Sequence, residues 1–231
     1  MKRSEINQIM RSADAFIRAQ SFHLPPFAYW TPKEWSQKGP EAREIVERAL
    51  GWDITDFGSG DFRKIGLFLF TIRNGDPANL KTGKGKLYAE KILISDEDQI
   101  TPMHFHWNKM EDIINRGGAD LMIQVFNSTP DEGLDKVSDV QVNLDGVVKT
   151  VAAGTTLKLL PGESISIPQG LYHKFWGGNG KVMIGEVSLV NDDNLDNRFL
   201  EPAGQMPEVD EDEEPLFPLC NEYGNYYLYK R

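Results

Sequence analysis

Cysteine and histidine are both scarce in this sequence. Its 231 residues include a single cysteine, Cys220, and four histidines. One cysteine excludes a fold held together by intrachain disulfides and is typical of a protein from a reducing compartment. Because the chain has so few imidazoles, the place where they gather is informative.

Positive charge and long apolar runs are also in short supply. Lysine and arginine number 25 against 35 aspartates and glutamates, which gives a net charge of −10. This balance disfavours binding to nucleic acid or to an anionic membrane. No stretch approaches the roughly 20 apolar residues of a membrane span, and the first helix-like segment lacks the continuous apolar region of a secretory signal. We therefore expect a cytoplasmic protein that acts on a small molecule or a divalent cation, with no nucleic-acid or membrane partner.

Residues 1–62 are predicted to form an N-terminal helical extension. Apolar residues recur there at a spacing of three to four behind Ser4, which is a candidate N-cap. Thr31 and Pro32 suit the N-cap and the first position of a second helix, and the stretch "PEAREIVERALG" predicts a third helix that ends at Gly51.

Residues 63–200 are predicted to form many short β-strands. Runs rich in branched and aromatic side chains, such as "IGLFLFTIRNG" and "ADLMIQVFN", are separated by turn-forming pairs at strand-length intervals. Asp145-Gly146, between two alternating runs, is a strong hairpin signal. Because no helices intervene, the pattern favours an antiparallel barrel or sandwich over a parallel sheet. The expected fold class is mainly β.

Residues 201–231 form a polar tail that is first acidic and then aromatic. Like charges in the run "EVDEDEEP" repel one another, so we expect a solvated loop there. The closing "CNEYGNYYLYKR" carries four tyrosines, which we expect to pack on the barrel or on a second subunit.

Two of the four histidines stand in one short stretch, "TPMHFHWNKMEDIINRGG". Side chains two residues apart in a strand point to the same face, so His104 and His106 project together. The next residues can turn the chain, after which Glu111 opens a returning strand. A third imidazole, His173, follows the tight turn "PQG" on another strand. These four side chains form a candidate metal site, and the alternative is a hydrogen-bonded core network without an ion.

The donor set restricts which ion would bind. Three neutral imidazoles and one carboxylate leave a divalent ion with a residual charge of about +1 and, in octahedral geometry, two open positions. Nitrogen and oxygen donors without thiolate suit Mn²⁺, Fe²⁺, Co²⁺, Ni²⁺ or Zn²⁺. Two adjacent open positions could bind a sugar through its carbonyl and neighbouring hydroxyl, or equally O₂ together with a chelating substrate.

The spacing of these residues resembles the two motifs of the cupin superfamily. The matching stretches are "HFHWNKMEDIINRGG" and "PGESISIPQGLYH". The resemblance implies a cupin-type jelly-roll β-barrel whose interior holds one divalent ion on His104, His106, Glu111 and His173. Two positions depart from the pattern: Asp98 stands where a glycine is expected, and Gly177 stands where an asparagine is expected.

Further stretches resemble the D-lyxose isomerase family. They are "HLPPFAYWTPKEW" near the N-terminus, "GEVSLVNDDNLDN" after the second motif and "DEDEEPLFPLCNEY" near the C-terminus, so the resemblance spans nearly the whole chain. It implies a metal-dependent aldose–ketose isomerase that interconverts D-lyxose with D-xylulose and, more slowly, D-mannose with D-fructose. It also implies Mn²⁺ as the usual ion, a sugar as the small-molecule partner and a homodimer.

Such an isomerisation moves a proton between C2 and C1 and needs an acid or a base beside the metal. The catalytic candidates are Lys109, on the turn before Glu111, and Glu186, the only charged residue in "VMIGEVSLV". Three alternatives stay open: Lys109 could be a solvated turn residue, Glu186 could belong to a structural network, and Glu111 could itself act as the base.

Two further residues are candidates for sugar binding. Lys91 lies in the strand-like run "YAEKILI", where its neighbour Glu90 points to the opposite face, and strand parity does not say which of the two faces inward. Asp192 either contacts sugar hydroxyls or caps a turn. His23 is expected to be structural, and the alternative is that it lines the mouth of the barrel.

Two functions compete with the isomerase at this stage. One is a cupin oxygenase or oxalate-type enzyme that uses the same ligands with O₂. The other is a barrel that binds a sugar without catalysis.

Overall fold

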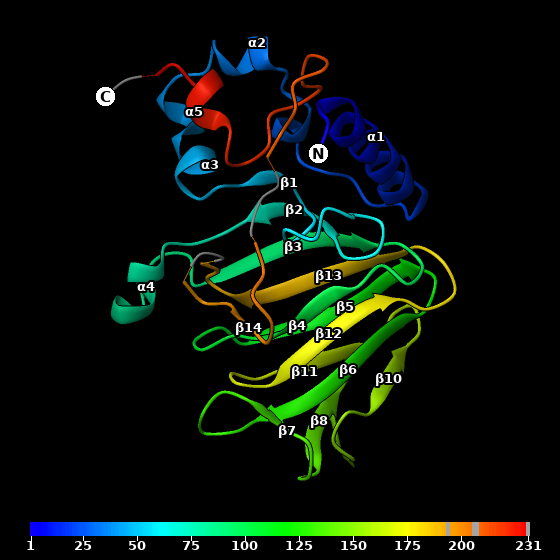
Figure 1. Cartoon of the computed structure of the whole chain (residues 1–231). Helices are drawn as coiled ribbons and strands as arrows, with labels where there is room; N and C mark the ends of the chain where they lie inside the picture. The colour runs from blue at the N-terminus through cyan, green and yellow to red at the C-terminus, as the bar shows by residue number, and fades with distance from the viewer. Residues whose placement is uncertain (193–194, 205–207, 230–231) are drawn as a thin grey trace.

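Two curled sheets face each other in the computed structural model, which describes residues 1–192, 195–204 and 208–229 (Figure 1). The larger sheet has eight strands in the order β1-β2-β3-β13-β5-β11-β8-β9. The smaller sheet has the order β10-β6-β12-β4-β14, with β7 paired to β6. Among the described residues, all twelve strand pairs are antiparallel. The predicted mainly β jelly-roll barrel with an N-terminal helical extension is confirmed.

The strands of the larger sheet are β1 (Gly51–Thr55), β2 (Leu67–Arg73), β3 (Tyr88–Ser95), β13 (Val182–Leu189), β5 (Glu111–Gly118), β11 (Ser164–Ile167), β8 (Val140–Leu144) and β9 (Val147–Val151). Those of the smaller sheet are β10 (Thr156–Leu159), β6 (Leu121–Ser128), β7 (Leu134–Asp135), β12 (Tyr172–Gly177), β4 (Thr101–Phe105) and β14 (Arg198–Phe199).

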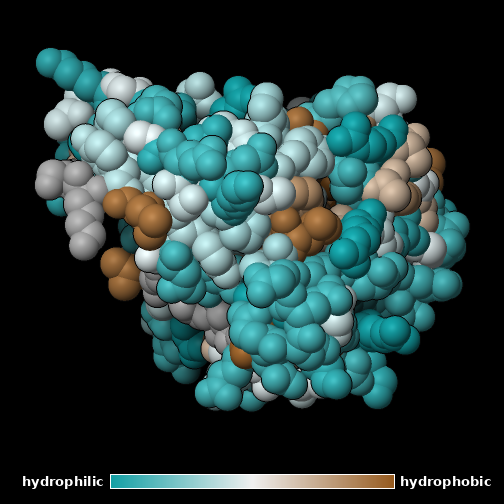
Figure 2. Space-filling view, turned by 90° about the horizontal axis from the view of Figure 1, so that it is seen from above, coloured by the Kyte–Doolittle hydropathy of each residue, from teal (hydrophilic) through white to brown (hydrophobic). Residues whose placement is uncertain are grey.

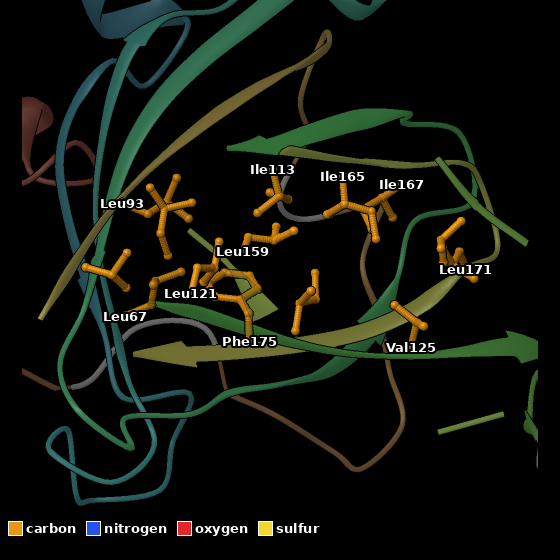
Figure 3. Close-up of a cluster of buried hydrophobic side chains, with 14 of the residues drawn as sticks. Leu67, Leu93, Ile113, Leu121, Val125, Leu159, Ile165, Ile167, Leu171 and Phe175 are labelled. Atoms are coloured by element: carbon orange, nitrogen blue, oxygen red, sulfur yellow. The ribbon is translucent and has the colours of Figure 1, made fainter. Parts of the chain in front are cut away.

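Alternating side chains from both sheets fill the space between them. β6 buries Leu121, Ile123 and Val125, while the residues between them are only partly buried. These side chains meet Leu93 and Ile113 of the larger sheet in one apolar cluster (Figure 3). The cluster packs the sheets together and so holds the polar side chains on the same inward faces in place.

The hairpin predicted at Asp145-Gly146 is confirmed. It joins β8 to β9 with Leu144 opposite Val147. Both turn residues have positive φ angles, 52° and 84°, as expected for a type I′ turn between two twisted strands.

The helix α1 (Arg3–Ala19) covers the outer face of the larger sheet (Figure 1). Its buried face, which includes Ile6, Met10 and Ile17, packs in a second apolar cluster with Phe68 of β2 and Ile92 of β3. The apolar spacing seen in the sequence therefore marks the face of α1 that docks on the sheet.

Two details of the predicted helical segment are wrong. Ser4 lies inside α1, and the N-cap residue is Lys2. The helix expected to end at Gly51 consists of η2 (Pro40–Ala42) and α3 (Arg43–Glu47) and stops four residues earlier. Gly51 instead opens β1, with a φ of 116°, because backbone pairing with β2 outweighs local helix propensity.

The start of α2 (Pro32–Trp35) follows the prediction. Thr31 is its N-cap and forms a reciprocal capping box with Glu34. The remaining short helices are η1 (Pro26–Tyr29), α4 (Pro77–Thr82) and α5 (Tyr223–Tyr226).

The acidic run of the tail binds to the start of α1. Arg3 is fully buried, and its Nη2 lies 2.6 Å from Oε1 of Glu211. The backbone N–H and the hydroxyl of Ser4 donate to the carboxylate of Asp212 at 2.8 and 2.7 Å. Free N–H groups and the positive end of the helix dipole favour carboxylates at this position. The acidic residues of the run are exposed and lie in a loop, as expected, and two of their carboxylates fix that loop to the start of α1.

The aromatic end of the tail packs on residues 1–62. The Tyr223 hydroxyl donates to the carbonyl of Leu50 at 2.5 Å, and the ring of Phe217 stacks on Trp52 of β1 with a centroid distance of 5.7 Å. Seen from the side of α1 and α5, the surface is largely hydrophilic and its hydrophobic residues form small separate groups (Figure 2). Within the described ranges, no helix has both the length and the apolar character needed to cross a bilayer.

Candidate metal centre and active site

Three histidines meet on the two neighbouring strands β4 and β12. His104 lies directly opposite His173 in the strand register, and their ring centroids are 4.2 Å apart. His106 follows β4, and its ring centroid is 5.0 Å from that of His104. All three are at least 92% buried. The sheet thus joins the two sequence motifs into one site.

Each of these imidazoles uses Nδ1 to bind a backbone carbonyl. His104 binds the carbonyl of Pro102 at 2.8 Å, His106 that of Asp196 at 3.0 Å, and His173 that of Leu171 at 3.0 Å. Because a carbonyl only accepts, Nδ1 carries the proton in each ring and Nε2 keeps a lone pair. This is the usual way in which a protein fixes the tautomer and orientation of a metal-binding histidine.

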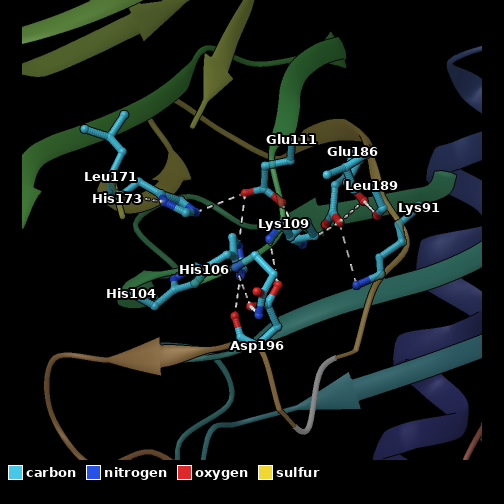
Figure 4. A network of polar contacts seen from close by, with 12 residues as sticks. Lys91, His104, His106, Lys109, Glu111, Leu171, His173, Glu186, Leu189 and Asp196 are labelled. Atoms are coloured by element: carbon cyan, nitrogen blue, oxygen red, sulfur yellow. Dashed lines mark hydrogen bonds and ion pairs between the residues drawn. The ribbon is translucent and has the colours of Figure 1, made fainter. Parts of the chain in front are cut away.

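The remaining lone pairs lie close together beside a carboxylate. One nitrogen from each of the three rings lies within 4.8 Å of the other two. Oε1 of Glu111 is 3.1 Å from Nε2 of His173 and 3.4 Å from Nε2 of His106 (Figure 4). Two unprotonated ring nitrogens and a carboxylate oxygen are all acceptors, so they cannot satisfy one another by hydrogen bonding. A cation between them would, and this favours a metal site over a hydrogen-bonded network.

The electrostatics of the site suit metal binding. Burial, together with the nearby rings of His173 and His106, lowers the pKa of His104 well below its usual value of 6.5. Burial alone would raise the pKa of Glu111, but the Lys109 ammonium and the His106 and His173 rings lower it well below 4.5. Neutral imidazole and ionised carboxylate are the forms that bind a divalent ion.

A row of alternating charges leads away from the histidines (Figure 4). Nζ of Lys109 lies 2.7 Å from Oε2 of Glu111 and 2.8 Å from Oε1 of Glu186, and Nζ of Lys91 lies 3.7 Å from the same Glu186 oxygen. All four side chains are at least 95% buried. Lys109 is therefore not a solvated turn residue. Glu186, the only charged residue in the apolar run "VMIGEVSLV", has two ammonium partners, Lys109 and Lys91.

The strand register also decides which neighbour of Lys91 faces outward. Lys91 is opposite Glu186 on β13, and both point into the barrel. Glu90 lies on the outer face and pairs with Arg73 at 3.0 Å.

A cavity of about 610 Å³ opens beside this row of charges. His104, His106, Glu111, Lys109, Glu186 and Lys91 all line it. So do residues from both ends of the chain, among them Arg48, Asp53 and Cys220. The cavity is large enough for a monosaccharide, and its polar groups converge on one side.

Sequence reasoning selected Asp192 from the stretch "VNDDNLDN" and passed over Asp196. Asp192 lines the cavity, and its carboxylate accepts a bond from the N–H of Leu195 at 3.2 Å. Asp196 is the residue that contacts the metal site, through the bond to His106 and through the backbone of Lys109 at 2.8 Å. The stretch contains several aspartates close together, and nothing in the sequence indicates which of them contacts Lys109, 87 residues earlier in the chain.

The two departures from the cupin pattern leave the ligands intact. Asp98 has a positive φ of 56°, which aspartate tolerates better than most residues. At Gly177, the last residue of β12, a Cβ would collide with the carbonyl oxygens of Gly180 and Asp96, so asparagine would not fit this position. His23 is exposed and takes no part in the histidine cluster.

The chain resembles known proteins along nearly its whole length. A family model described as D-lyxose isomerase matches residues 1–223. The D-lyxose/D-mannose isomerase of Serratia proteamaculans is 48% identical over 226 residues, which cover 96% of this chain and 98% of the relative. The protein of the same description from Escherichia coli O157:H7 is 47% identical over 229 residues, which cover 98% of this chain and 100% of the relative.

Solved structures share the fold at much lower sequence identity. The L-ribose isomerase of Acinetobacter sp. DL28, solved with L-ribose, superposes with a TM-score of 0.59 at 12% identity and covers 91% of this chain and 98% of its own. The L-ribose isomerase of Geodermatophilus obscurus has a TM-score of 0.57 at 15% identity, with the same coverage. These likenesses support the fold alone.

Proposed function

The chain belongs to the D-lyxose isomerase family, and on that premise we propose that it interconverts D-lyxose with D-xylulose and D-mannose with D-fructose. It is an aldose–ketose isomerase, and family membership favours this activity over an oxygenase or a sugar-storage barrel. The observation that carries the proposal is the row formed by Glu111, Lys109 and Glu186. It places acid–base groups on the same cavity as the histidine cluster.

We propose that His104, His106, Glu111 and His173 hold one divalent ion. The facing acceptors described above support this set, because a cation would satisfy all of them. When bound, the ion would supply positive charge that stabilises the enediolate of the isomerisation. Mn²⁺ is our choice from the family resemblance, with Co²⁺, Fe²⁺, Ni²⁺ and Zn²⁺ compatible with the same donors.

Conversion of the aldose to the ketose takes a proton from C2 and delivers one to C1, while O2 loses a proton and O1 gains one. We assign the carbon-bound proton to the carboxylate of Glu186. The Lys109 ammonium, 2.8 Å from that carboxylate, is placed to donate hydrogen bonds to the substrate oxygens. Lys91 and Asp192, which also line the cavity, are assigned to sugar hydroxyls.

Three organisational features belong to the same proposal. Residues 1–62 act as a helical extension that leads into strand β1 of the larger sheet, residues 63–200 as the rest of the barrel and residues 201–231 as the tail. The first and last of these segments both supply cavity residues. A homodimer and a cytoplasmic location follow from the family resemblance and from the single cysteine. Light scattering would test the dimer.

A sugar-panel assay tests the function. Chelator-treated protein should regain D-lyxose isomerisation when Mn²⁺ is added, and the Glu186→Gln variant should still bind Mn²⁺ but lose turnover by about 100-fold or more. The proposal fails if no pentose or hexose turns over with any of the five ions. Oxygen consumption with a dicarboxylate would point to the oxygenase instead.

A further inference from the structure

Asp196 anchors the loop between β4 and β5. Its Oδ1 accepts bonds from the backbone N–H of Asn108 at 2.7 Å and from the side-chain amide of Asn108 at 2.9 Å, and its Oδ2 accepts from the backbone N–H of Lys109 at 2.8 Å. The residue is only 6% exposed. The bond to the N–H of Lys109 is buried, and a buried backbone N–H needs an acceptor; the same carboxylate also accepts from the N–H of Asn108.

The same residue also touches a proposed metal ligand. Its main-chain carbonyl accepts the Nδ1–H of His106 at 3.0 Å. Phe199, three residues later in β14, pairs with His104, and the two ring centroids are 5.3 Å apart. The segment around Asp196 therefore lies along His104 of β4 and along His106, which follows that strand.

These contacts connect a proposed metal ligand, His106, with Lys109, which is proposed to donate hydrogen bonds to the substrate. His106 presents Nε2 toward Glu111 at 3.4 Å, whereas Lys109 extends its ammonium between Glu111 and Glu186. Both side chains leave the same short loop, so the position of its backbone sets both. The position of that backbone is held from outside the loop by Asp196.

We propose that Asp196 is a positioning residue that couples metal affinity to proton transfer. Its carbonyl fixes the tautomer and direction of His106, and its carboxylate fixes the loop from which Lys109 reaches the reacting groups. The inference rests on the proposed isomerase function for its kinetic part and on the histidine cluster alone for its metal part.

The test compares Asp196→Ala and Asp196→Asn with a matched control. Asp135 also holds two successive backbone N–H groups, those of Val137 and Ser138, both at 2.9 Å, and it does not line the cavity. Asp135→Asn should therefore leave Mn²⁺ affinity and kcat unchanged. For each variant we would measure Mn²⁺ binding by calorimetric titration, kcat and KM for D-lyxose, and the unfolding temperature.

The Asn variant keeps one acceptor oxygen and so can hold only one of the two backbone N–H groups. We expect kcat to fall by about 100-fold, because a shift of about 1 Å in Lys109 is enough for that loss, while KM stays within a few-fold. In the Ala variant the segment carrying the carbonyl loosens as well, and the Mn²⁺ dissociation constant should rise by about 10- to 100-fold.

A purely structural role would lower the unfolding temperature but leave Mn²⁺ affinity and kcat of the folded protein at wild-type values, and that result overturns the proposal. Should the Ala variant not fold, unchanged kcat in the Asn variant overturns it equally. If wild-type protein turns over no sugar, the proposed function has failed, and the Mn²⁺ titrations of the Ala and wild-type proteins still decide whether Asp196 positions His106.

Discussion

Replacing Lys109 by methionine tests the buried charges of the site most directly. Its ammonium lies 2.7 Å from Glu111 and 2.8 Å from Glu186, and all three side chains are at least 95% buried. At an effective dielectric constant of about 20, each contact amounts to about 6 kcal/mol before desolvation. Much of this offsets the cost of removing three charges from water, which is several kcal/mol for each ion.

Loss of the cation alone leaves two buried carboxylates close together, with Nζ of Lys91 3.7 Å from Glu186. Breaking a buried ion pair from one side costs about 3–5 kcal/mol, so Lys109→Met should reduce the free energy of unfolding of the metal-free protein by this amount. The double variant Lys109→Met/Glu186→Gln should recover part of the loss, because one unpaired charge is removed. Urea denaturation followed by tryptophan fluorescence would measure all three proteins.

The control is Lys158→Met. Lys158 pairs with Asp120 at 3.5 Å, but its side chain is 55% exposed, so its removal should cost less than about 1 kcal/mol. If Lys109→Met also costs less than about 1 kcal/mol, or if the double variant is no more stable than the single one, the assignment of Lys109 to a buried charge network is refuted.

Three further predictions concern the ion, the tail and the edge strand. Mn²⁺ should stabilise the metal-free protein by about 4 kcal/mol at 1,000 times its dissociation constant, and thermal unfolding should show no such gain for His173→Ala; an equal gain would remove His173 from the ligands. The hydrogen bond from Arg3 lowers the pKa of Glu211, so its contribution to stability is present above about pH 4.5 and is lost as the pH falls through the lowered pKa. Glu211→Gln should therefore be less stable than wild type at pH 7, and in urea titrations the difference should shrink as the pH falls below about 4.5; a pH-independent difference would contradict this. Gly51→Ala should cost about 1–3 kcal/mol in the same assay, because the left-handed backbone is strained for alanine and the Tyr223 hydroxyl occupies the place of the Cβ; if Tyr223→Phe does not relieve any of the loss, the collision is not its cause.

Several features of this protein follow from the sequence alone. Period-two alternation assigns the strands and puts His104 and His106 on one face, because successive side chains of a strand must point to opposite sides. Asp145-Gly146 specifies a turn because these residues tolerate positive φ angles. The spacing of the two motifs identified the proposed ligands without any knowledge of the register.

The tertiary structure decided everything that depends on the pairing of distant strands. The pairing of β3 with β13 turned Lys91 inward beside Glu186, and the loop before β5 carried Lys109 into the interior, where a turn lysine would ordinarily be solvated. Gly51 starts a strand rather than ending a helix because its backbone pairs with Thr71 of β2. Asp196 shows the limit most clearly, since its partners lie 87 to 90 residues away along the chain. Local patterns report on neighbours within a few residues, whereas hydrogen bonds between segments this far apart exist only once the barrel has closed.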